Sequence, residues 1–267
     1  MKKNSFTFFL FLSSIFLFYV NAEAATIRLS SPKVELELAP GESYSGEIMA
    51  ENPTKEEVKT RIYLEDWVYS PGGTGEKKFT PAGSTPLSAS KWIKFSPAED
   101  FIQPFGRLAA HYTVTVPPDA KGVYYSVLFF ETTLGTTKDD EGVNVLVAAR
   151  IGALFFIEIK GTVNREGSIK SAEIQLPQGN RPMEISTTFQ NTGNVYINLG
   201  GKFLIMDSAG KIQGRGDLKT IYTFPDSTES GKSEWVGRLP KGSYQLLLTY
   251  DLGKGKNIVE ERTFTIT

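Results

Sequence analysis

The sequence predicts an all-β protein made of two immunoglobulin-like β-sandwich domains in tandem. Short segments rich in β-branched and aromatic residues alternate apolar with polar positions, and Gly, Pro or Asn separates them. No segment sustains the i, i+3, i+4, i+7 spacing of an amphipathic helix. The strand series occurs twice within 267 residues, and several short antiparallel strands per hundred residues are typical of such sandwiches.

The N-terminus has the three parts of a secretory signal peptide. Lys2 and Lys3 form a charged start, an apolar run covers 6–20, and the AEA at 22–24 fits a small-x-small cleavage site. A retained membrane anchor is the alternative, but the run is shorter than the roughly 20 residues that cross a bilayer. We therefore expect residues 1–24 to be removed, leaving a periplasmic or extracellular protein with no stable membrane span.

Composition narrows the range of functions. The chain has no cysteine, so we expect neither a disulfide framework nor a lipid anchor, and the fold depends on its own apolar core. The 29 basic and 30 acidic residues give a net charge of −1. Because lysine and arginine form no cluster along the sequence, we expect no nucleic-acid partner.

We assign residues 25–160 to the first domain. Its predicted strands alternate or run apolar between turn residues, and they are VELELA (34–39), YSGEIMAEN (44–52), VKTRIYLEDW (58–67), LAAHYTVTVP (108–117) and VYYSVLFFETT (123–133). Two stretches, 70–90 and 134–142, have the glycine and polar content of loops.

The stretch VNVLVAARIGALFFIEI (143–159) has three possible interpretations. A membrane helix would bury Arg150 at a cost of about 2.5–3.5 kcal/mol, and a soluble core helix would hold many strand-favouring residues. We therefore predict a strand, the last of the first domain, forming a hairpin with 123–133. One straight strand would be about 55 Å long at about 3.3 Å per residue, so we expect Gly152 to mark a bulge or kink.

We assign residues 161–267 to the second domain, with the boundary in GTVNREG (161–167). Short strand-like segments follow, separated by turns such as SAGK (208–211). EIMAENPT (47–54) and STTFQNTG (186–193) each end a strand in Asn and then turn, a weak internal echo that supports duplication.

The sequence offers little catalytic chemistry. His111 is the only histidine, and its alternation with neighbours in LAAHYTVTVP predicts a solvent-facing strand position. The acidic run at 139–141 lacks the alternate-oxygen spacing of a calcium loop and is typical of a solvated hairpin tip. We expect no enzyme activity, no cofactor and no metal.

The first domain resembles the N-terminal domain of periplasmic pilus chaperones. The matching pieces, in order, are SPKVELELAPGES, IMAENPTKEEVKTRIYLEDW, KWIKFSPAEDFIQPFGRLAAHYTVTVPPDAKGVYYSVLFFE and VLVAARIGALFF, within 31–157. The resemblance implies that the last strand of this domain pairs by strand addition with an incoming exported polypeptide such as a pilus-like subunit. The edge positions it implies are Val143, Val145, Leu146 and Val147.

The same resemblance implies two basic residues that hold the partner's terminal carboxylate. By position these are Lys33 and Arg150. The chain departs from the family pattern where Phe155-Phe156 is followed by Ile157-Glu158 in place of Arg-Pro. Arg150 also has a purely structural interpretation, in which it pairs with a neighbouring carboxylate or extends to solvent.

A second resemblance gives an alternative function. FQNTGN, the DSAGK turn and LPKGSYQ are similar to surface proteins that partner WxL-type wall proteins of Gram-positive bacteria. That likeness implies an adhesion module that recognises peptidoglycan or a wall-associated protein. Its contact surface would be the aromatic residues around the long loop, which otherwise serve core and edge packing: Trp67, Tyr69, Trp92, Phe95, Phe101 and Phe105.

Overall fold

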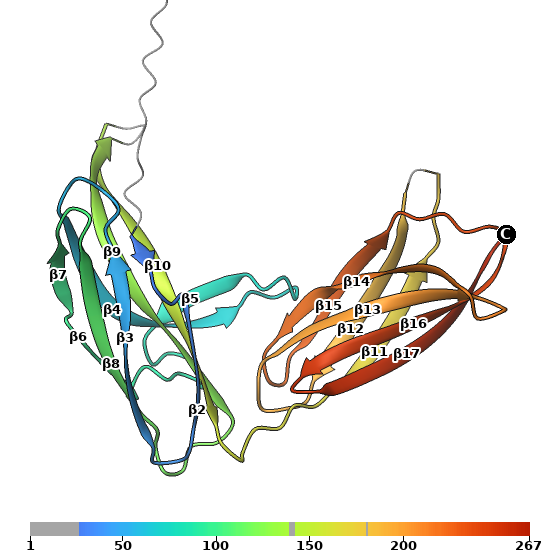
Figure 1. The fold of residues 1–267 in the computed structure, drawn as a ribbon, viewed down its shortest axis with the longest axis horizontal. Coiled ribbons are helices and arrows are strands. Elements are labelled where there is room, and N and C mark those ends of the chain that lie inside the picture. Colours follow the sequence, from blue (N-terminus) through green and yellow to red (C-terminus); the bar gives the residue numbers. More distant parts are fainter. Residues whose placement is uncertain (1–26, 139–141, 180) are drawn as a thin grey trace, which may run out of the picture.

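The computed structural model describes residues 27–138, 142–179 and 181–267, and every regular element among them is a strand (Figure 1). Two β-sandwiches follow one another along the chain, as the sequence predicts. The predicted signal peptide and the acidic run at 139–141 lie outside the described residues. Within the described ranges, no helix has the length and apolarity that a membrane span requires.

The first sandwich consists of two sheets that enclose an apolar core. One sheet has the order β1-β3-β8-β6, with strands Arg28–Leu29, Ser43–Glu51, Arg107–Thr115 and Ile93–Ser96. The other has the order β2-β10-β9-β4-β5, with strands Lys33–Leu38, Asn144–Ile159, Val123–Lys138, Val58–Tyr69 and Lys77–Pro81. The short strand β7 (Glu99–Ile102) pairs with β4 at the outer side of this sheet.

The N-terminal segment of this domain changes sheets. β1 pairs with β3 in one sheet, and after a break at 30–32 the chain continues as β2, which pairs in parallel with β10 in the other. Pro32 lies in the break, where it lacks a donor but its carbonyl accepts from Leu154 N at 3.0 Å. The switch places β2 beside only the second half of β10.

The second sandwich packs a three-stranded sheet, β11-β12-β15, against a four-stranded sheet, β14-β13-β16-β17. The first consists of Gly167–Gln175, Met183–Asn191 and Thr228–Trp235, and the second of Ile212–Thr223, Ile197–Asp207, Gly242–Gly253 and Lys256–Ile266. Strand β12 alternates strictly between buried and half-buried residues, as expected for a strand with one face on a core.

Aromatic rings join the two domains. Trp67 and Tyr125 of the first domain contact Phe224 of the second, with ring centres 5.5 and 4.9 Å apart. The loop at 70–76, which we call the strap, extends from the β4–β5 hairpin to the second domain (Figure 1). There Tyr222 N donates to Gly73 O at 3.1 Å. The two cores are therefore continuous across the joint.

Of the stretch 143–159, residues 144–159 form one strand, β10, but the predicted bulge at Gly152 is wrong. Gly152 pairs in register with Phe129, and the only shift in the β9–β10 ladder falls between Val147 and Ala148. A Cβ atom on Gly152 would lie 2.9 Å from the Phe129 ring and 2.5 Å from Val127. The glycine therefore makes room for cross-strand side chains and leaves the ladder unchanged.

Candidate functional site

The N-terminal half of β10 has a strand neighbour on one side only. Over the described residues, 144–153 pair with β9, and β2 joins from Leu154 onward. On the other side, β4 pairs with β9 only as far as Thr132, so no described strand forms a second neighbour of 133–138 in β9. Residues 133–138 and 144–149 form a two-stranded projection beyond the sandwich, which we call the ribbon (Figure 1).

Backbone groups along the open side of β10 are available for pairing. Leu154 N and Lys160 N donate to β2, at Pro32 O and Leu38 O, while Ile159 N points the other way, to Gly122 O. Because successive residues of a strand point their amides to opposite sides, even-numbered residues face the β2 side. The N–H and C=O groups of Arg150 and Ala148 therefore face the open edge.

Apolar side chains are exposed along the same ribbon. Val145 is 42% exposed, Leu146 62% and Val147 38%, and Val143, which precedes the strand, is 56% exposed. The alternation places Val145 and Val147 on the face that carries Ala153 and Phe155 in the core further along the strand. An open backbone edge next to exposed apolar side chains is the arrangement that strand addition uses.

Arg150 lies at the base of the ribbon, on the face of the sheet opposite to the core. Its Nη1 lies 3.0 Å from Glu65 Oε1 and 3.3 Å from the Tyr63 hydroxyl. Its guanidinium lies 4.2 Å from the centre of the Phe129 ring and 5.5 Å from that of Phe79. The hydrogen bond to Tyr63, reinforced by the charge of Glu65, raises the pKa of Arg150. Arg150 thus has a carboxylate partner within its own domain.

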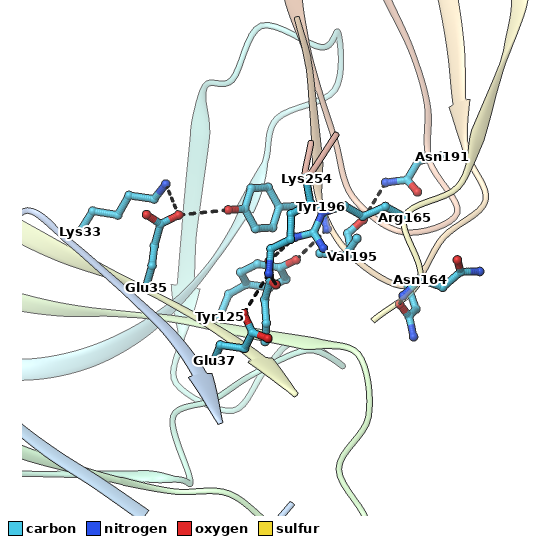
Figure 2. Close-up of polar contacts among 12 residues, drawn as sticks. Lys33, Glu35, Glu37, Tyr125, Asn164, Arg165, Asn191, Val195, Tyr196 and Lys254 are labelled. Carbon is cyan, nitrogen blue, oxygen red and sulfur yellow. Dashed lines mark hydrogen bonds and ion pairs between the residues drawn. The ribbon is translucent and has the colours of Figure 1, made fainter. Parts of the chain in front are cut away.

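Lys33 lies at the start of β2, where the open edge ends. Its ammonium group lies 4.6 Å above the Phe156 ring and 2.6 Å from Glu35, and both Lys33 and Glu35 are exposed. Figure 2 shows Lys33 beside Glu35, whose carboxylate accepts from the Tyr196 hydroxyl of the second domain at 3.4 Å. Glu35, Phe156 and Tyr196 line a cleft between the domains, and Lys33 lies beside it.

Lys33 and Arg150 share one face of the sheet but do not touch one another through any described contact. Lys33 is opposite Leu154 in the ladder, and Arg150 precedes Leu154 by four residues. At about 3.3 Å per residue, the two positions are about 13 Å apart along the strand. Their roles as carboxylate anchors stay predictions.

The cleft contains an interdomain ion cluster that the sequence analysis missed. Lys254, in the β16–β17 turn, contacts Glu37 at 2.9 Å and Glu158 at 3.1 Å (Figure 2). The hydrogen bond and the charge of Lys254 lower the pKa of Glu37, and both carboxylates raise the pKa of Lys254. Arg165, in the interdomain link, also pairs with Glu158. These charges are far apart in sequence, so no local pattern reveals them.

The other sequence candidates contribute less to a site. His111 is an exposed residue of β8, 3.7 Å from Glu47. Trp67 is only 1% exposed and donates to Ser126 O, so it packs in the core and does not form an exposed stacking surface beside the loop. Phe101 and Phe105 are exposed. Within the described ranges, no group of three or more His, Asp or Glu residues could hold a metal ion.

Comparison with known proteins yields fold relatives only. No family model and no curated protein matches the chain. Among solved structures, the class 5 fimbriae chaperone CfaA covers 89% of this chain and 99% of its own, with a TM-score of 0.45 and 14% identity. The CsuC–CsuE chaperone–tip adhesion subunit complex of Acinetobacter baumannii covers 89% and 98%, with a TM-score of 0.43 and 13% identity. The match to the E. coli chaperone DraB covers 91% of this chain and 99% of DraB, with a TM-score of 0.39 and 13% identity.

These three matches to fimbrial or pilus chaperones each extend over most of the chain. The identities are 14% or less and the TM-scores are below 0.5 in all three comparisons. Functional inference therefore depends on this chain's own edge, charges and cavities. The second resemblance, to WxL-partnering surface proteins, stays a prediction.

Proposed function

We propose that this chain is a non-catalytic, exported envelope protein that binds another exported polypeptide by strand addition, as a chaperone does. The observation that supports this most is the ribbon, where β10 combines an unpaired backbone edge with exposed valine and leucine side chains. Natural sheets usually protect such edges with charges, prolines or covering loops. Export itself rests on the signal-peptide features of residues 1–24.

The incoming strand would lie on the open side of β10, in line with β2. Its backbone would bond the amides and carbonyls of Ala148 and Arg150, and its alternate side chains would meet those of Val145 and Val147. If Lys33 holds the terminal carboxylate of that strand, the strand ends where β2 begins. It would then run parallel to β10, since β2 itself is parallel to β10.

Arg150 would contribute a second contact. Its described hydrogen bonds use Nη1 only, and a guanidinium has five N–H donors. The remaining donors would bind a main-chain or terminal oxygen of the partner while Glu65 keeps the side chain oriented.

Binding is tested by co-expressing the chain with each exported protein encoded beside it and isolating complexes by size-exclusion chromatography. Val147→Asp places a charge where the partner would bury an apolar side chain, which costs several kcal/mol. We expect at least a tenfold loss of affinity. Val259→Asp, at an exposed position of β17 in the second domain, is the matched control. Equal binding by both variants would disprove strand addition at this edge.

The wall-binding alternative makes a different prediction. A protein that recognises peptidoglycan sediments with purified cell-wall sacculi, whereas a strand-addition protein stays in the supernatant. Sedimentation that survives Val147→Asp would favour the alternative.

A further inference from the structure

A groove of about 450 Å³ lies at the joint between the two domains, away from the ribbon. Its volume falls within the range of small-molecule sites, which occur preferentially at domain interfaces. Most of the lining is aromatic or aliphatic, and both domains contribute to it. The apolar lining residues are Trp67, Val68, Tyr69, Pro86, Leu87, Tyr125, Tyr222, Phe224 and Pro225.

The first-domain wall of the groove is fixed by a buried carboxylate. Asp66 is fully buried and accepts hydrogen bonds from the Ser88 and Ser90 hydroxyls, both at 2.6 Å, and from Thr85 N at 3.1 Å. These bonds hold the segment that carries Pro86 and Leu87. A wall fixed before binding loses little entropy when a ligand arrives.

The strap holds the second-domain wall of the groove in place. Gly72 N donates to Glu229 at 2.8 Å, and Gly75 packs directly against the Tyr222 ring. Tyr69, which leads into the strap, lies 5.3 Å from Tyr222 and 5.0 Å from Phe224 between ring centres. The aromatic lining is therefore assembled from two domains in a defined geometry.

The charged residues that line the groove favour a cationic ligand. Asp226 and Glu229 line the groove, and no lysine or arginine does. Asp226 is exposed, has a positive φ of 62°, and its carboxylate has no hydrogen bond to a described residue. Nearby, the ammonium of Lys77 lies 5.7 Å above Trp67 and 5.6 Å above Tyr69, so a cation already occupies those faces. Among described residues, no cation lies over Tyr222 or Phe224.

We propose that the groove binds a small organic ammonium compound, with an apolar or aromatic body between Leu87 and Phe224 and its amine near Asp226. The apolar lining would bury the body of the ligand. The amine would form a charge-assisted hydrogen bond with the Asp226 carboxylate and cation–π contacts with the rings of Tyr222 and Phe224. This site is separate from the ribbon and does not depend on strand addition.

The test titrates the full mature protein with three probes that share the indole ring: tryptamine with a cationic chain, indole-3-propionate with an anionic chain, and indole with none. Binding is followed by NMR shifts of the amides lining the groove. We expect saturable binding of tryptamine, weaker binding of indole and weakest binding of the anion. No saturable binding of tryptamine, or equal affinity for all three probes, would overturn the proposal.

Two variants localise the site. Asp226→Asn keeps a residue that tolerates positive φ and should weaken tryptamine about two- to fivefold, the worth of an exposed ion pair, while leaving indole unchanged. Asp217→Asn, an exposed acid on β14 outside the groove, should change neither. Leu87→Trp should fill the groove and abolish binding of both probes. Identical tryptamine affinity for Asp226→Asn and Asp217→Asn would refute the assignment.

Discussion

Arg150 stands out in the sequence as one charge in an apolar stretch, and its neighbours in the fold define its role. Glu65 and Tyr63, which contact its guanidinium, lie 85 and 87 residues earlier in the chain. Periodicity placed the residue on a strand, but only the pairing of β4 with β9 brings these partners within reach. The sequence therefore left the structural and the anchoring interpretation both open.

Arg150→Ala removes a partly exposed ion pair and the contact with the Phe129 ring. We expect a loss of about 1 kcal/mol in the free energy of unfolding, measured by urea denaturation. Lys33→Ala, at an exposed pair, should lose less than about 0.5 kcal/mol. If Arg150→Ala is as stable as the unmodified protein, the guanidinium contributes nothing to holding β10.

Asp66 is a residue that the sequence analysis missed, because its hydroxyl donors lie in a segment predicted only as a loop. Burial acts to raise its pKa, but the hydrogen bonds from Ser88, Ser90 and Thr85 outweigh burial and leave it lowered. Such a carboxylate stabilises the fold above the unfolded pKa of about 3.9. The stabilisation is lost as the pH falls through the folded pKa.

Asp66→Asn should therefore lower the free energy of unfolding by about 2 kcal/mol at pH 7, which is the usual contribution of hydrogen bonds to a charged group. The cost should shrink as the pH falls below about 4, because the carboxyl of the unfolded chain then binds a proton while the folded carboxyl, with its lowered pKa, stays charged. Urea denaturation at pH 7 and pH 3 measures both values, with Asp119→Asn, an exposed turn residue, as the control. A cost that stays constant with pH would contradict the role of the charge.

At the scale of elements, the strand pattern predicted β10 and its hairpin with β9, since both alternate or run apolar. The open edge could not be predicted in the same way. It arises because the N-terminal segment leaves one sheet at 30–32 and joins β10 only from Leu154. Gly152 was misjudged because a bulge and a close side-chain approach leave the same signal in a sequence.

Amide hydrogen exchange checks the edge in the free protein. The amides of Ala148 and Arg150 should exchange quickly, because they face the open side. The amides of Ala149 and Ile151, which face β9, should exchange at least about tenfold more slowly. NMR resolves each amide, and equal protection along 148–151 would show that the edge is covered.

At the scale of the whole molecule, the stretch 70–90 was predicted as a loop, but it contains strand β5 (Lys77–Pro81), and its part at 70–76 connects the two domains. The glycines of this stretch indicated only a loop, yet Gly73 and Gly75 allow close approach to the second domain. A Cβ atom on Gly75 would lie 2.7 Å from the Tyr222 ring, whereas one on Gly72 would meet nothing within 4 Å. Contacts between residues some 150 positions apart leave no local pattern from which to predict them.

Gly75→Ala should therefore loosen the joint, and Gly72→Ala, which shares a positive φ and the same loop, should not. Spin labels at the exposed positions Lys94→Cys and Lys211→Cys measure the interdomain distance, and the chain has no native cysteine to interfere. We expect a broader distance distribution for Gly75→Ala only. The same distribution in both variants would show that the strap does not fix the joint.

Site-specific crosslinking tests the central proposal most directly. A photoreactive amino acid at Val147 should form an adduct with an exported protein in intact cells, and one at Val259 should not. Ala148→Pro, which removes an edge-facing N–H, should abolish the adduct, while Ala148→Ser should preserve it. An adduct that is absent at Val147, or that persists unchanged in Ala148→Pro, would contradict recruitment of a partner strand by β10.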